Sequence, residues 1–190
     1  GFVQLTGEVG AGKTTLCRAL LDQLGQNFST ALILDPALDP DQLIKSVATE
    51  FGLNTQGLDR LACITEINFF LLEQMAHERE SVLIIDEAQN LTNDLLEQVR
   101  LLSNLETDDR KLLQIVLMGQ PELRDRLNQH SLRQLRQRIT VRYHLRSLKR
   151  SEIAQYVQHR LHVSGGKGPP YFTKLALWRI HRYSKGIPRL

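Results

Sequence analysis

A glycine-rich stretch near the start of the chain has the composition of a phosphate-binding loop. Gly7–Thr14 reads G-E-V-G-A-G-K-T and fits the pattern G-x-x-x-x-G-K-[ST]. The glycines allow a concave loop whose backbone N–H groups point inward, and the helix that follows turns its positive amino end toward the same place. The alternative is a glycine-rich turn without a ligand. The residues expected to contact phosphate are Gly7, Glu8, Val9, Gly10, Ala11, Gly12, Lys13, Thr14 and Thr15.

Two carboxylates at the end of an apolar run have the chemistry of a metal site. Val82–Ile85 is wholly apolar and is followed directly by Asp86 and Glu87. A buried parallel strand that ends there would place Asp86 at the carboxyl edge of the sheet, beside the glycine-rich loop. Asp86 and the Thr14 hydroxyl could then hold Mg²⁺ while Lys13 reaches the β- and γ-phosphates. The alternative is an acidic pair that only caps a helix.

Glu87 is the candidate general base. Its carboxylate could polarise a water in line with the γ-phosphate, provided that it lies within hydrogen-bond reach. Gln120 follows an apolar run that ends in Met118-Gly119, and it would face the same water if that run is a strand between the first and third strands. It could also be a simple turn residue. An Asn-Lys-x-Asp sequence, typical of guanine recognition, is absent, so the pattern favours Mg²⁺-dependent hydrolysis of ATP.

Three arginines are candidates for contacting the transferred phosphoryl group. Arg136 and Arg138 lie in L-R-Q-R-I, between a helical pattern and the fifth apolar run, where a guanidinium could reach the ATP of an adjacent subunit. Arg189 follows the last helical pattern and could lie over the γ-phosphate of its own chain. Each of the three could instead be a solvated surface residue.

The elements that must position these residues alternate between strands and helices. This alternation predicts a three-layer α/β fold built on a mainly parallel sheet. Thr92 is the expected cap of the helix that ends near Leu102. The expected strands are Phe2–Thr6, Ala31–Leu34, Val82–Ile85, Leu112–Met118 and Ile139–Leu145, and the expected helices are Lys13–Leu24, Asp41–Phe51, Leu58–His77, a helix from Thr92 to Leu102, and one that starts after Pro121.

After Leu145 the strand patterns stop. Ser151–His162 and Lys174–Lys185 are helical, and the Gly/Pro-rich Ser164–Pro170 connects them. We therefore expect a nucleotide-binding α/β core over residues 1–146, followed by the start of a helical lid over 147–190.

Charge is distributed unevenly along the chain. Residues 1–123 hold 8 Lys/Arg and 19 Asp/Glu, a net charge of −11, whereas residues 124–190 hold 16 and 2, a net charge of +14. A basic segment of this kind is solvated surface, a contact for an acidic neighbour or a contact for nucleic acid.

Cys17 and Cys63 lie in helical patterns and are expected to be packed, reduced thiols. The longest apolar runs fall short of the roughly 20 residues of a membrane-spanning helix.

The motifs occur in the order of the AAA+ ATPases. The glycine-rich loop, Asp86-Glu87, Gln120, Arg138 and Gly186–Arg189 match Walker A, Walker B, sensor 1, the arginine finger and sensor 2. Within AAA+, the chain resembles the ExeA and MshM group, the general secretion pathway protein A type. The stretches that carry this resemblance are Gly7–Arg18, Ile84–Asn90, Leu101–Asp109, Leu135–Leu145 and Ile180–Leu190.

The resemblance implies more than the residues alone. It implies a five-stranded parallel sheet followed by a helical lid, self-association into a ring, and a cytoplasmic ATPase domain of an inner-membrane protein. Such proteins serve the assembly of secretion machinery or type IV pili, and a periplasmic part can engage peptidoglycan. The sequence begins on Gly1 within an apolar run, so we expect a fragment that lacks the preceding adenine-contacting segment and the end of the lid.

Two other functions remain open at this stage. AAA+ regulators of transposition share much of the motif set, and the basic last third would suit contacts with DNA phosphates. However, the sequence shows no helix-turn-helix module and no zinc-finger spacing. The third possibility is a nucleotide-gated interaction module that binds ATP with little turnover.

Overall fold

The chain forms two compact units. The computed structural model describes residues 1–34, 36, 39–107, 110–166 and 172–189. One unit, the sheet unit, comprises Gly1–Thr6 and Lys13–His144, and the other, the loop-and-helix unit, comprises Gly7–Gly12 and Leu145–Leu190. The glycine-rich loop therefore groups with the C-terminal helices, an arrangement that the sequence did not indicate.

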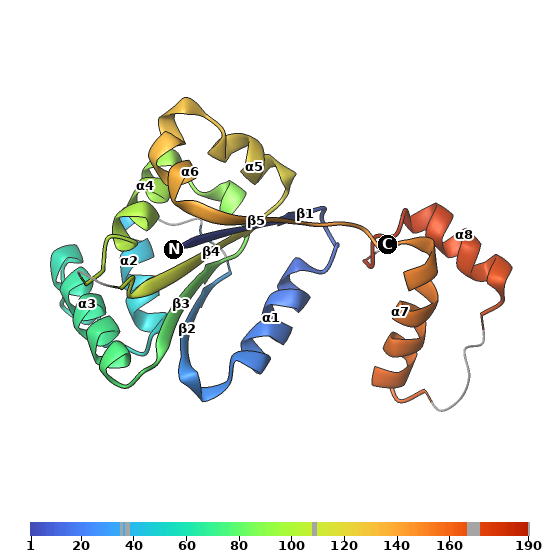
Figure 1. The fold of residues 1–190 in the computed structure, drawn as a ribbon, viewed down its shortest axis with the longest axis horizontal. Helices are drawn as coiled ribbons and strands as arrows, with labels where there is room; N and C mark the ends of the chain where they lie inside the picture. Colours follow the sequence, from blue (N-terminus) through green and yellow to red (C-terminus); the bar gives the residue numbers. More distant parts are fainter. Residues whose placement is uncertain (35, 37–38, 108–109, 167–171, 190) are drawn as a thin grey trace. The chain divides into compact units, whose positions relative to one another are not determined.

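Five strands form one sheet in the order β2-β3-β4-β1-β5 (Figure 1). Adjacent pairs run parallel, with Leu83 opposite both Ala31 and Ile115. The parallel sheet that was expected is confirmed, and the fourth strand lies between the first and third. The strands are β1 Phe2–Gly7, β2 Phe28–Ile33, β3 Glu80–Ile85, β4 Leu113–Gly119 and β5 Ile139–Leu145.

β5 lies along β1 and runs in the same direction. At one end of the pair, the Thr140 hydroxyl donates to the Phe2 carbonyl at 3.2 Å, and at the other end the Thr6 hydroxyl lies 3.1 Å from the His144 ring nitrogen Nδ1. The start of β5 is therefore at the amino edge of the sheet, a full strand length away from the carboxyl edge.

Helices cover both faces of the sheet, with α1 on one face and α2, α3 and α4 on the other (Figure 1). The side chains of Leu83, Ile85, Leu113, Ile115 and Leu117 on the second face pack into one apolar core with those helices. The helices of the sheet unit are α1 Lys13–Leu24, α2 Pro40–Glu50, α3 Arg60–Ala76, α4 Asn93–Leu102, α5 Pro121–Leu127 and α6 Arg133–Arg138, with short 3-10 turns at Gly25–Asn27, Ala88–Asn90 and His130–Leu132.

Most boundaries agree with the sequence patterns within one or two residues, and the largest difference is in β2. The apolar run predicted a strand over Ala31–Leu34, but β2 begins at Phe28 because Phe28 already pairs with Glu80 of β3. Strand pairing, which a local apolar pattern does not report, sets this boundary. In α2 a capping box joins Asp39 and Gln42, so the helix begins at Pro40.

The loop-and-helix unit contains α7 Arg150–Val163 and α8 Lys174–Ser184. Thr173 caps α8 through a hydrogen bond from the Ala176 N–H, and the Leu148 N–H donates to the Gly186 carbonyl at 2.8 Å. The second half of the expected Ser164–Pro170 connection lies outside the described residues. Among the helices that the structure describes, none has the length and apolar character required to cross a membrane.

Thr92 caps α4, as expected, and accepts a hydrogen bond from the Leu95 N–H at 3.2 Å. Because valine has the same shape without the hydroxyl, Thr92→Val should lower the free energy of unfolding by about 1 kcal/mol. Thr92→Ser, which keeps the acceptor, should stay within a few tenths of a kcal/mol of the wild type. Urea unfolding followed by circular dichroism measures both, and equal losses in the two variants would contradict the cap.

Candidate functional site

Thr14 and Asp86 form the centre of the site in the sheet unit. The Thr14 hydroxyl, in the first turn of α1, donates to Asp86 Oδ2 at 2.6 Å. Asp86 follows the last residue of β3 and is only 3% exposed. Its backbone N–H donates to the Ile33 carbonyl, and its Oδ1 accepts the Glu87 N–H, each at 2.8 Å. These bonds fix the carboxylate at the carboxyl edge of the sheet.

This pair has the donor set of a magnesium site. A hydroxyl and a carboxylate are hard oxygen ligands, and Mg²⁺ is commonly held by one or two such protein groups together with substrate phosphates. No group of three or more His, Cys, Asp or Glu side chains is close enough to hold a metal within the described part of the chain. Thr14 and Asp86 therefore fit a Mg²⁺ that shares its coordination with a bound phosphate.

Glu87 begins a tight turn directly after Asp86. Its backbone is left-handed, with φ of 48°, a conformation that costs a non-glycine residue of order 1 kcal/mol. Its carboxylate Oε2 accepts a hydrogen bond from Gln89 Nε2 at 2.6 Å and another from Gln120 Nε2 at 3.4 Å. The structure thus brings Asp86, Glu87 and Gln120 together and adds Gln89.

Gln89 received no role from the sequence, although it lies within the stretch Ile84–Asn90 that carried the resemblance. A polar residue two positions after Glu87 is the only local signal. Its importance depends on a 3-10 turn at Ala88–Asn90, which curls the side chain back toward the Glu87 carboxylate. The tight turn, and not a residue pattern, creates this contact.

Lys13 is buried at the start of α1, with 6% of its surface exposed. Its neighbour on the same helix face, Cys17, is also buried. Burial raises the pKa of the Cys17 thiol, and the negative charge of Asp86 raises it further. Cys17 is therefore a protonated packing residue, as the sequence indicated, and Cys63 is likewise a buried free thiol.

In the loop-and-helix unit, the glycine-rich loop is closed by a hydrogen bond from the Ala11 N–H to the Glu8 carbonyl at 3.1 Å. Gly10 has φ of 77°, and a Cβ there would lie 2.5 Å from the Cβ of Arg189 and 3.3 Å from the side chain of Ile187. The absence of a side chain at Gly10 therefore lets the Ile187–Arg189 segment pack directly on the loop. Arg189 therefore lies against Gly10 of the loop, and its expected position over the γ-phosphate stays a prediction.

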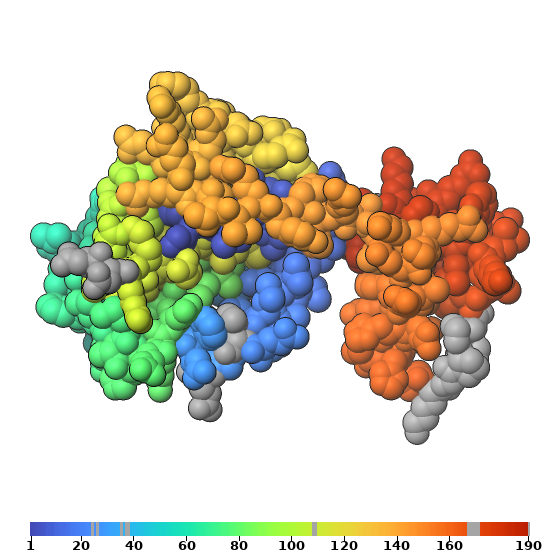
Figure 2. Space-filling model, viewed as in Figure 1, coloured from blue at the N-terminus to red at the C-terminus, as the bar shows by residue number. Residues whose placement is uncertain are grey.

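Arg138 lies at the other edge of the sheet unit. It immediately precedes β5, and its guanidinium donates to the buried Ser103 hydroxyl at 2.6 Å. Within the sheet unit, the six residues of β1, roughly 20 Å, separate this edge from the carboxyl edge that holds Asp86. Arg136 donates to the Asn128 carbonyl at 3.5 Å. The segment from α5 through β5 lies on the surface (Figure 2). Arg136 and Arg138, at the amino edge of the sheet, are not near Thr14 or Asp86 at the carboxyl edge.

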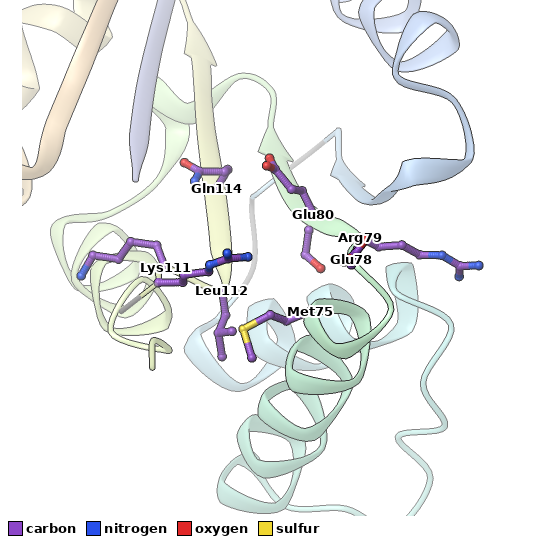
Figure 3. Close-up of a pocket in the computed structure, with 9 residues that line it drawn as sticks. Met75, Glu78, Arg79, Glu80, Lys111, Leu112 and Gln114 are labelled. Carbon is purple, nitrogen blue, oxygen red and sulfur yellow. The ribbon is translucent and has the colours of Figure 1, made fainter. Parts of the chain in front are cut away.

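A separate cavity of about 520 Å³ lies at the amino edge of the sheet. Figure 3 shows Glu80 and Gln114, from β3 and β4, at this cavity with Arg79, Lys111 and Met75. Lys111 is paired with Glu106. Because Asp86 follows the opposite end of β3, this cavity is not part of the Thr14–Asp86 site.

Comparison with known families matches residues 1–127 to the AAA domain, which is about two thirds of the chain. The chain belongs to the AAA domain family. Three of the stretches that carried the resemblance, Gly7–Arg18, Ile84–Asn90 and Leu101–Asp109, fall within this match, whereas Leu135–Leu145 and Ile180–Leu190 follow it. Asp108, Asp109 and Leu190 lie outside the described residues.

This AAA domain is 50% identical over its full length to general secretion pathway protein A of Aeromonas hydrophila. The resemblance to the general secretion pathway protein A type is therefore confirmed. The chain spans 35% of that relative's length.

Solved structures show the same fold. The ADP form of the ORC2 protein of Aeropyrum pernix superposes with a TM-score of 0.64 at 16% identity, covering 85% of this AAA domain and 46% of that chain. Cdc6p of Pyrobaculum aerophilum gives a TM-score of 0.64 at 17% identity, covering 94% and 47%. At these identities the likeness establishes the fold.

The contact between Gly10 and Arg189 can be tested by substitution. Gly10→Ala adds a Cβ that overlaps Arg189, whereas Gly12→Ala, also at a positive φ, meets nothing within 4 Å. Both variants place alanine at a positive φ, 77° at position 10 and 99° at position 12, but only Gly10→Ala adds the overlap with Arg189. We expect amide exchange at Ile187 to become about tenfold faster in Gly10→Ala than in Gly12→Ala, measured by hydrogen–deuterium exchange. Equal exchange in the two variants would show that the segment does not pack on the loop.

Proposed function

We propose that this AAA domain binds Mg-ATP and hydrolyses it to ADP and phosphate. The observation that carries the proposal is the Thr14–Asp86 pair with the Glu87 carboxylate directly beside it. The motif Gly7–Thr14 would hold the phosphates through its backbone N–H groups, and Lys13 would neutralise the β- and γ-phosphates. The full phosphate-binding set in this proposal is Gly7, Glu8, Val9, Gly10, Ala11, Gly12, Lys13, Thr14 and Thr15.

Each catalytic residue has a separate part in the proposed reaction. Thr14 and Asp86 would hold Mg²⁺, which when bound would supply positive charge to stabilise the charge that develops on the phosphates. Glu87 would accept a proton from water as the water oxygen bonds to the γ-phosphorus and the bond to the β–γ bridging oxygen breaks. Gln120 would orient that water, and Arg189 would contact the γ-phosphate from the end of the loop-and-helix unit.

Arg138 is proposed to act on the nucleotide of a neighbouring chain. Because it precedes β5 at the amino edge of the sheet, it is a full strand away from its own Thr14 and Asp86. A head-to-tail oligomer would bring it to the site of an adjacent copy, where a guanidinium stabilises phosphoryl transfer. Arg136, on the preceding turn, is the second candidate for this role.

We also propose that the chain divides into an α/β core, residues 1–146, and the start of a helical lid, residues 147–190.

The nucleic-acid alternative is less well supported by the structure. Several arginines of the basic segment are engaged by their own chain: Arg126 donates to the Gln89 carbonyl and to Asn93, Arg138 to Ser103, and Arg142 to the Arg136 carbonyl. Each of these hydrogen bonds would have to be exchanged before its guanidinium group could contact a DNA phosphate. DNA binding at low salt would nevertheless revive this alternative.

The cellular role proposed here follows from the relative of Aeromonas hydrophila, whose name places it in the general secretion pathway. We propose that the chain is the cytoplasmic ATPase domain of an inner-membrane protein that drives assembly of a secretion or type IV pilus system. Its partners would be copies of itself and components of that system, and further parts of the protein would provide a membrane anchor and a peptidoglycan-binding region.

Phosphate release from Mg-ATP tests the proposed reaction. Turnover should rise more than linearly with protein concentration, because each site would need a neighbour's arginine. Lys13→Ala should abolish ATP binding. Glu87→Gln should keep ATP bound and lower turnover by at least about 100-fold, since a general base contributes that much or more. Turnover that survives Glu87→Gln would refute the assigned base, and ATP binding without wild-type turnover would favour the nucleotide-gated module.

A mixing experiment tests the placement of Arg138. Lys13→Ala and Arg138→Ala should each be inactive alone, the first for lack of ATP and the second for lack of the guanidinium. When they are mixed in equal amounts, about a quarter of the interfaces pair an intact loop with an intact arginine by random assortment. Phosphate release should therefore reappear in the mixture. A mixture as inactive as its components would exclude an arginine acting between chains.

A further inference from the structure

The Gln89 side chain joins the two residues proposed to handle the water. Its Nε2 donates to Glu87 Oε2 at 2.6 Å, and its Oε1 accepts the backbone N–H of Gln120 at 3.0 Å. A carboxylate can only accept and a backbone N–H can only donate, so the orientation of this amide is fixed by its two partners. Gln89 therefore connects the turn after β3 to the residue after β4.

The backbone next to Gln89 is shaped to admit its side chain. A Cβ on Gly119 would lie 2.5 Å from Gln89 Oε1 and 3.0 Å from the Leu123 side chain. Gly119 is the last residue of β4, so only a residue without a side chain permits the amide to reach the Gln120 N–H at this point. The close approach of Gly119 follows from the same position of the Gln89 amide oxygen.

The turn that carries Gln89 is also held from outside. Arg126 of α5 donates to the Gln89 carbonyl at 2.6 Å and to Asn93 Oδ1 at 3.0 Å. The backbone of Gln89 is thus tied to α5 while its side chain is tied to Glu87 and Gln120. Both ends of the residue are fixed, which limits the positions that the Glu87 carboxylate can take.

We propose that Gln89 is a positioning residue that holds the Glu87 carboxylate and Gln120 in one arrangement for attack by water on the γ-phosphate. Both amides bind Oε2 of Glu87, which assigns Oε1 to the water. Gln89 itself contacts neither substrate nor metal in this assignment. The inference rests on the proposed ATP hydrolysis and adds a residue that acts through Glu87.

Two substitutions of similar size separate positioning from simple packing. Gln89→Met removes both hydrogen bonds. Gln89→Glu keeps an acceptor for the Gln120 N–H but places a second carboxylate against Glu87, which pushes the base away. If Gln89 only supports the fold of the turn, Gln89→Glu should restore function that Gln89→Met loses. Under the positioning role, Gln89→Glu should be at least as impaired as Gln89→Met.

We expect kcat to fall by about 10- to 100-fold in both variants, with KM and the affinity for a fluorescent ATP analogue unchanged, because a misplaced catalytic group costs rate and not binding. Gln114→Met and Gln114→Glu, on β4 at the opposite edge of the sheet, are the matched controls and should keep wild-type turnover. Melting temperatures for all four variants check folding. Wild-type kcat in Gln89→Glu, or a raised KM with unchanged kcat, would overturn the proposal.

A second readout does not depend on turnover. Amide exchange at Gln120 should become faster in Gln89→Met and stay slow in Gln89→Glu, because only the second variant keeps the acceptor. Unchanged exchange in Gln89→Met would overturn the inferred contact. If the wild type binds ATP without hydrolysing it, the proposed function fails, and the exchange result decides separately whether Gln89 holds the two elements together.

Gly119 provides a double-mutant test. Gly119→Ala should lower kcat in the wild-type background by displacing Gln89, and it should lower kcat little further in Gln89→Ala, where the obstructing amide is gone. Equal losses in the two backgrounds would show that Gly119 acts through Leu123 or the strand, independently of Gln89.

Discussion

The hydrogen bond between Thr14 and Asp86 is the contact around which the sheet unit is arranged. It joins the first turn of α1 to the end of β3, residues 72 positions apart in the chain. In the strand order β2-β3-β4-β1-β5, β4 lies between β3, which ends just before Asp86, and β1, which precedes Thr14 in the chain. Gln120, directly after β4, therefore comes to lie beside Glu87, the residue after Asp86. The strand order makes one site from three distant segments.

A strained turn follows this contact, and its surroundings hold it in place. Glu87 is left-handed, yet the backbone of the turn is bonded at several points, including the Glu87 N–H to Asp86 and the Asn90 N–H to the Glu87 carbonyl. Arg126 adds a charged donor to the Gln89 carbonyl. Strain of this kind persists only where neighbouring contacts over-determine the conformation. The number of hydrogen bonds around Glu87 is consistent with a carboxylate that must occupy one position.

The sequence was sufficient for features with a strong local cause. Apolar runs located the buried strands, and side-chain caps such as Thr92 located helix starts. The identities of Asp86, Glu87 and Gln120 followed from what comes directly after an apolar strand. The sequence was insufficient for features that depend on contacts a local pattern does not show. β2 begins at Phe28 because Phe28 pairs with β3, and Gln89 contributes to the site because a turn folds its side chain back onto the Glu87 carboxylate. The roles assigned to Arg136, Arg138 and Arg189 remain predictions.

The hydrogen bond between Arg138 and Ser103 bears on when Arg138 would contact the nucleotide of a neighbouring chain. Within one chain the Arg138 guanidinium donates a hydrogen bond to the neutral Ser103 hydroxyl, and its charge also helps to lower the pKa of the Glu97 carboxyl, which is itself paired with Arg100. Hydrogen bonds from a cation to an anion are roughly twice as strong as those between neutral groups. A neighbouring chain with an empty site offers little to replace Ser103, whereas one with a bound triphosphate offers several negative oxygens. Under the proposed role between chains, nucleotide occupancy and self-association are thermodynamically linked: ATP tightens the oligomer, and the oligomer tightens its hold on ATP by the same factor.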